Sequence, residues 1–263
     1  MSEMPSLVNL FSPKNIIIFM LVFTRLSGLI ATAPFFSTVS MPNQIKIWFC
    51  ATIAFIMYPV ISAKAHFVIP NSMPEFIVLM LLEFGIGFLI GFIANLLFVG
   101  AQMVGELISI QMGLSMAQVF DPATGTSTPI YSTFYVYLVT LVFLSTRAYE
   151  YLFAALFKSF FALPIGFSGV LDQGMTSAIV KLSAHIFQIA FGLAMPIFSV
   201  LLVCDILLGM ASKILPQMNI FMVSLPFKIF LGIVLMLMFL KGSVGYLQEV
   251  SVDYLKAILG LFT

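Results

Sequence analysis

The chain has 263 residues, of which 62% are hydrophobic and 8% are charged, and its formal net charge is +1. Soluble domains carry about 25% charged residues, so this composition, with a mean hydropathy of +1.16, predicts an integral membrane protein. The basic residues are scattered singly, which excludes a polybasic surface for nucleic acid; we expect contact with membrane lipid and no nucleic-acid partner.

The first two hydrophobic runs are long enough to be membrane helices. Ile16–Phe36 has about 20 apolar residues, the length that crosses a bilayer as a helix. The segment before it lacks the basic start of a secretory signal, so we expect this run to be retained. Arg25 lies in its middle, where contact with lipid is costly, and should therefore face protein or water. In the second run, Ile45–Ser62, Pro59 is expected to kink or end the helix.

The third run, Phe76–Ile110, gathers small and polar residues on one side. At 100° per residue these positions fall in a sector about 140° wide. They are Glu83, Gly87, Gly91, Ala94, Asn95, Ala101, Gln102, Gly105, Glu106 and Ser109. One interpretation is helix packing, in which the glycines admit a neighbouring backbone and the amides bond across helices. The other is a face that borders a water-filled conduit, because two intramembrane carboxylates need water or a partner. Both can hold.

The segment between the third and fourth runs, Glu106–Pro129, ends in a breaker-rich stretch that predicts a loop. Its apolar residues form deformable bulk that can close a hole to water and ions, and its turn residues let the backbone move. The residues of this candidate gate are Gln111, Met112, Gly113, Leu114, Met116, Val119, Phe120, Asp121 and Pro122. The alternative is a plain exposed connector.

The second half continues with further apolar runs and one polar interruption. The runs are Ile130–Leu144, Tyr149–Leu163 as an interfacial or partner-packed helix, Ile179–Val203 with a kink at Pro196, Ile229–Leu240, and an amphipathic tail over Val244–Phe262. Together these runs predict an all-α membrane protein with about six long hydrophobic helices arranged as hairpins.

The polar interruption, Asp205–Lys228, has the pattern of a re-entrant segment. Asp205 and Lys213 share a helix face but lie about 12 Å apart, so each needs a partner elsewhere. Proline is expected to stop the helix, and amides that follow it can satisfy the freed backbone groups. The intramembrane polar residues of interest here are Asp205, Lys213, Pro216, Gln217, Asn219 and Lys228.

The sequence lacks the usual signatures of catalysis. It has no GxxxxGK[ST], HExxH or GxSxG motif. Cys50, Cys204, His66 and His185 stand apart from one another in the sequence. We therefore expect no enzyme activity, no catalytic residue, no cofactor and no metal.

Several motifs, taken in order along the whole chain, resemble the FliR family of the flagellar type III export gate, called SctT in virulence secretion systems. The matching residues are Arg25, Gly28, Pro34 and Pro42; Glu83, Gly87, Phe88, Gln102, Gly105, Gln111 and Gly113; Asp121 and Pro122; and Asp205, Leu207, Gly209, Pro216–Phe221, Pro226 and Lys228. The virulence version differs in system and not in mechanism.

The resemblance implies one membrane domain inside a helical hetero-oligomeric export gate. Residues 1–205 would correspond to a FliP-like part and residues 206–263 to a FliQ-like hairpin. The partners implied are FliP-like and FliQ-like gate subunits, FlhA-like and FlhB-like apparatus proteins, and unfolded flagellar substrates. The location implied is the bacterial inner membrane at the flagellar basal body. In the family, the loop matching Gln111–Ser127 plugs the lumen.

Two other functions remain open at this stage. An ion-coupled secondary transporter of a small solute would use Asp205 and the broken segment after it as its binding site. A purely structural scaffold would have no role in the lumen, and trimming Gln111–Phe120 would then leave ion leakage unchanged.

Overall fold

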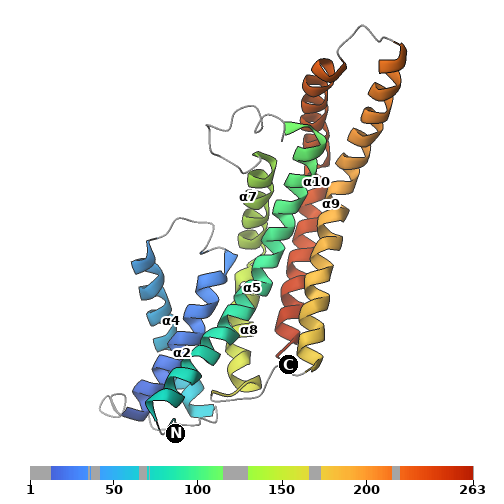
Figure 1. The fold of residues 1–263 in the computed structure, drawn as a ribbon. Helices are drawn as coiled ribbons and strands as arrows, with labels where there is room; N and C mark the ends of the chain where they lie inside the picture. Colours follow the sequence, from blue (N-terminus) through green and yellow to red (C-terminus); the bar gives the residue numbers. More distant parts are fainter. Residues whose placement is uncertain are drawn as a thin grey trace. The chain divides into compact units, whose positions relative to one another are not determined.

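The computed structural model describes residues 13–34, 36, 42–64, 70, 72–114, 130–165, 173–214 and 220–262. Within these ranges the regular structure is seven α-helices and no strand (Figure 1). They are α2 (Pro13–Thr32), α4 (Asn43–Lys64), α5 (Met73–Gln111), α7 (Ile130–Ser145), α8 (Ala148–Ala162), α9 (Gln173–Ile214) and α10 (Ile220–Gly260). The predicted all-α membrane class is confirmed.

The number of spans also agrees with the sequence. Among the described residues, five helices are long and apolar enough to cross a membrane, and the pair α7 and α8 counts as a sixth if it is one broken span. That pair bends by 71°. The bend passes through Arg147, whose backbone has a φ of 52°, a left-handed conformation that interrupts a right-handed helix.

The helix boundaries in the second half differ from those expected. Both α9 and α10 continue through a proline, Pro196 and Pro226 respectively, and α10 joins the sixth run and the tail in one helix of 41 residues. Asp205–Ile214 belongs to α9 and Ile220–Lys228 to α10, while residues 215–219 between them lie outside the described residues. The re-entrant interpretation of Asp205–Lys228 stays a prediction. A proline removes one backbone hydrogen bond, and these helices of 42 and 41 residues continue despite that loss. Likewise, Pro59 lies inside α4 and does not end it.

The chain divides into two compact units, and the first comprises residues 1–95, 147–182 and 254–263. Within it, α2 crosses the first half of α5 at backbone contact. A Cβ on Gly28 would overlap the backbone of Phe84, and a Cβ on Gly87 would overlap that of Arg25. The hydroxyl of Tyr254 donates to the carbonyl of Ile93 at 3.0 Å, which ties the end of α10 to α5.

The second unit comprises residues 96–146 and 183–253. Here α5 approaches α7 closely, because a Cβ on Gly105 would overlap the backbone of Ser132. The rings of Phe98 and Phe143 meet edge to face at 5.6 Å between centroids. Helices α9 and α10 run side by side as an antiparallel hairpin (Figure 1), with Gly192 facing Tyr246.

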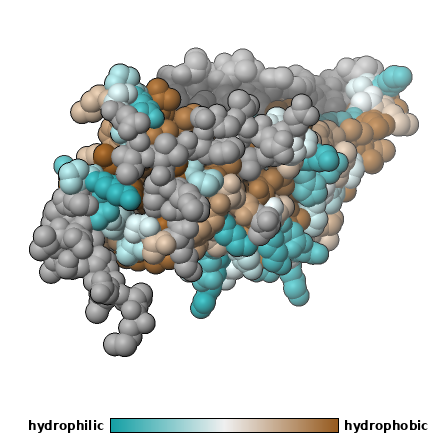
Figure 2. Space-filling model, turned by 90° about the horizontal axis from the view of Figure 1, so that it is seen from below, coloured by the Kyte–Doolittle hydropathy of each residue, from teal (hydrophilic) through white to brown (hydrophobic). Residues whose placement is uncertain are grey.

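Large hydrophobic side chains remain exposed in both units. Trp48 of α4 is 73% exposed and Met238 of α10 is 71% exposed. In Figure 2, brown hydrophobic atoms reach the surface beside teal hydrophilic ones. Only 11% of the most apolar stretch of α10 is buried. Such surfaces need lipid or other protein to cover them.

Candidate functional site

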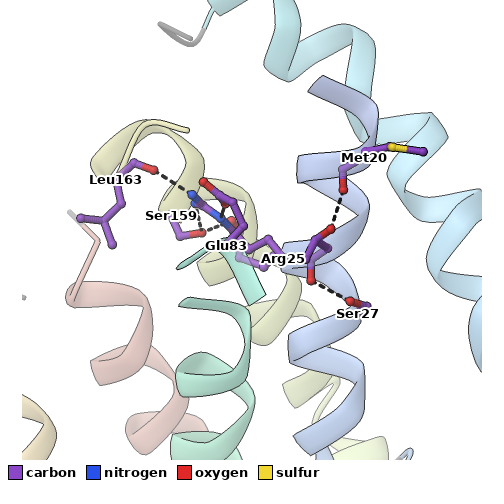
Figure 3. Close-up of polar contacts among 8 residues, drawn as sticks. Met20, Arg25, Ser27, Glu83, Ser159 and Leu163 are labelled. Atoms are coloured by element: carbon purple, nitrogen blue, oxygen red, sulfur yellow. Dashed lines mark hydrogen bonds and ion pairs between the residues drawn. The ribbon is translucent and has the colours of Figure 1, made fainter. Parts of the chain in front are cut away.

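Among the described residues, the most buried charged side chain is that of Arg25 in α2, which is 0% exposed. Its Nε donates to Glu83 Oε2 of α5 at 2.5 Å. One terminal nitrogen donates to the hydroxyl of Ser159 at 3.1 Å, and the other to the carbonyl of Leu163 at 3.0 Å (Figure 3). The guanidinium also lies over the ring of Phe160, 4.1 Å from its centroid.

These contacts give each nitrogen of the guanidinium an acceptor, one from α5 and two from α8 and its C-cap residue. The charge of Arg25 meets the carboxylate of Glu83, so neither faces lipid uncompensated. Sequence reasoning predicted protein or water around Arg25, and the structure supplies protein from the same chain. Ser159, Phe160 and Leu163 were not predicted as partners of Arg25, although a serine inside the apolar helix α8 was a usable signal.

The polar sector of α5 is largely covered by neighbouring helices. Gly87 and Gly91 face the backbone of α2, which is the arrangement of the packing interpretation. Asn95, Gln102 and Glu106 are half-buried. The amide of Gln102 donates to Glu106 Oε1 at 2.9 Å, one turn along the same helix. Whether this half-buried part borders a conduit stays a prediction.

A second polar cluster forms where α5 ends. The amide of Gln111 donates to Asp205 Oδ2 of α9 at 2.8 Å. The ammonium of Lys228, on α10, forms an ion pair with Asp205 Oδ1 and lies 3.5 Å from the Gln111 carbonyl oxygen. Asp205 therefore has the separate partners that its sequence position required, and three helices meet at its carboxylate.

The two residues after Gln111 are also fixed. The side chain of Met112 is buried and fills a notch that exists because residue 232 is glycine. Gly113 has a φ of +79°, which favours glycine and turns the chain out of the helix. No pattern in the sequence indicates that Met112 packs against Gly232.

Other predicted site residues are less constrained or fall outside the described ranges. Leu114 is half-buried, and Lys213 is exposed in the last turn of α9. The predictions that lie outside the described residues are Met116, Val119, Phe120, Asp121, Pro122, Pro216, Gln217 and Asn219. In the part of the chain that is described, no three His, Cys, Asp or Glu residues group as metal ligands.

Comparison with known proteins gives a consistent result. A family model described as bacterial export proteins, family 1, matches residues 16–252. The chain is 30% identical over 227 residues to the flagellar biosynthetic protein FliR of Aquifex aeolicus, covering 86% of each chain. It is 32% identical over 216 residues to FliR of Escherichia coli, covering 81% of this chain and 80% of the relative. With FliR of Bacillus subtilis the identity is 30% over 236 residues, 89% and 88% of the two chains.

Proposed function

Since this chain belongs to the FliR family of bacterial export proteins, we propose that it is a subunit of the flagellar protein-export gate in the bacterial inner membrane. In this role it forms part of the channel through which unfolded flagellar proteins cross the membrane. The observation that carries the proposal is the family match, which extends over residues 16–252 and so includes both compact units.

The exposed apolar faces support a role inside a larger assembly. Bulky side chains stand out from α4 and α10, and only 11% of the most apolar stretch of α10 is buried. We propose that FliP-like and FliQ-like subunits cover these faces, and that FlhA-like and FlhB-like proteins complete the apparatus. This chain supplies channel wall and not catalysis, because its ionised side chains at the two described clusters are engaged with one another.

The central loop is proposed to plug this channel between export events. Helix α5 ends at Gln111, whose amide is bonded to Asp205. The sequence after residue 114 contains Met116, Val119 and Phe120. Apolar bulk of this kind closes a pore by excluding water, and yields to an unfolded chain of any sequence.

Replacing residues 115–127 by an equally long Gly/Ser segment tests the plug. We expect the altered subunit to assemble with its partners, and the inner membrane to leak small ions several-fold faster in the absence of export, because water fills the pore once its apolar bulk is removed. Ion flux is measured in cells or vesicles that contain the assembled gate.

The same replacement at residues 166–172, between α8 and α9, is the matched control and should leave the membrane tight. If the central replacement leaves the assembled gate as tight as the control, the loop is an ordinary connector and the plug is excluded.

A secondary transporter is supported less well by the same geometry. Asp205, its expected ion site, lies inside the continuous helix α9 and is already paired with Lys228 and Gln111. A coupling site for a transported ion would need broken helices and open ligands at this depth.

A further inference from the structure

We propose that five residues from α9, α10 and the end of α5 form a contact that we call the root latch. It holds the start of the central loop against α9 and α10 while the channel is closed. The root latch consists of Gln111, Met112, Asp205, Lys228 and Gly232. The proposal rests on the gate function above and adds the means by which the loop is positioned. Its two halves are one polar and one apolar contact.

The polar half is built on both oxygens of one carboxylate. Asp205 accepts the Gln111 amide on Oδ2 and pairs with Lys228 through Oδ1, so a single side chain of α9 connects α5 with α10. The side chain of Asp205 is 40% exposed and that of Lys228 is 14% exposed. Ion pairs that reach solvent contribute little to stability. This contact is therefore suited to opening and closing, unlike the buried pair of Arg25.

The apolar half is a methionine seated in a glycine notch. A Cβ at position 232 would lie 2.5 Å from Met112 Cε, 2.6 Å from Sδ and 3.0 Å from Cγ. The end of the Met112 side chain thus occupies the space that any other residue at position 232 would fill. Methionine is unbranched and can leave and re-enter such a notch without moving the helices.

The backbone of Met112 and Gly113 ends helix α5 in a defined conformation. The N–H of Met112 donates to Ile108 O at 2.9 Å and that of Gly113 to Ile110 O at 3.0 Å, which closes the last turn of α5. Gly113 then adopts a left-handed conformation, with a φ of +79°, which does not continue the helix. Met112 and Gly113 therefore help to hold the start of the loop in place. The apolar side chains that fill the pore come from the residues after Leu114.

Ordinary helix packing would also bury Met112. The test must therefore distinguish a change in the position of the end of α5 from a loss of stability of the whole protein. Gly232→Leu fills the notch and should expel Met112, whereas Gly242→Leu places the same side chain on the same helix at a position with open space. Adding Met112→Ala to Gly232→Leu removes the side chain with which the new leucine competes, and should restore the position of the end of α5. Asp205→Asn weakens the polar half independently.

Two readouts are taken on the assembled gate. One is ion leakage. The other is the rate at which a water-soluble maleimide labels Leu114→Cys, in a background carrying Cys50→Ala and Cys204→Ala. We expect Gly232→Leu and Asp205→Asn to raise both rates several-fold, Gly242→Leu to raise neither, and the double variant Met112→Ala/Gly232→Leu to return toward the parent.

The outcomes distinguish the latch from the gate. Labelling and leakage equal to those of Gly242→Leu, in assembled gates, would overturn the latch even where loop replacement opens the pore. Faster labelling without leakage, together with a tight loop replacement, would retain the latch and remove the plug. If the Gly232→Leu variant fails to assemble, Asp205→Asn is compared with the charge exchange Asp205→Lys/Lys228→Asp. The latch predicts that maleimide labels Leu114→Cys more slowly in the charge exchange than in Asp205→Asn, and equal labelling would overturn it.

Discussion

Replacing Arg25 with methionine is expected to destabilise the protein by about 3–5 kcal/mol, because it removes the cation that forms an ion pair with the buried Glu83 carboxylate. The substitution also removes the hydrogen bonds to Ser159 and Leu163 and the cation above the Phe160 ring. Segments from α2, α5 and α8 would then lose their shared contact. The change is measured as the thermal unfolding midpoint of the purified complex in detergent.

The double variant Arg25→Met/Glu83→Met separates charge from packing. Replacing both members of a buried ion pair with apolar residues of similar size is often neutral, so the double variant should be more stable than the single one. Lys241→Met removes an exposed cation from α10 and should change the free energy of unfolding by about 0.5 kcal/mol or less. A double variant as unstable as Arg25→Met would show that the loss of the compensating charge beside Glu83 is not the cause.

Gly87→Leu is expected to separate α2 from α5 and to lower the unfolding midpoint strongly. Its Cβ would overlap the backbone carbonyl of Arg25 and lie 3.0 Å from the amide nitrogen of Leu29, and backbone atoms cannot rotate away as a side chain can. Overpacking of this kind costs about 1–3 kcal/mol or more. The shift of α2 would also stretch the hydrogen bond between Arg25 and Glu83.

Gly85→Leu is the matched control, two residues earlier in the same helix. A Cβ at position 85 meets nothing within 4 Å. Removing a glycine from a helix interior contributes about 1 kcal/mol of propensity, so this variant should be as stable as the parent or more stable. Equal losses from the two substitutions would contradict the close approach of α2 and α5.

Much of this fold can be predicted from hydrophobic run lengths, and the exceptions are local. The run Phe76–Ile110 became the single helix α5 with its ends nearly in place, since nothing polar enough interrupts it. The runs Ile229–Leu240 and Val244–Phe262, which were predicted separately, belong to the single helix α10, which continues through Pro226. The FliR resemblance is confirmed by the family match.

The site was harder to predict than the fold, for a physical reason. Helical periodicity places Gly87 and Glu83 on one face of α5, but it cannot say which distant helix that face meets. Arg25 had to have a partner, and the sequence offered ten acidic residues as candidates. Met112 is one of 17 methionines, and its place on Gly232 depends on how α5 and α10 pack.

The central claim is that this chain works as one subunit of a multi-subunit export gate. It is tested most directly by purifying a tagged copy from native membranes in mild detergent and identifying the proteins that accompany it by mass spectrometry. The account predicts recovery with a several-fold excess of FliP-like and FliQ-like subunits. Recovery of the chain alone, or only with further copies of itself, would contradict the gate and return attention to Asp205 as a transport site.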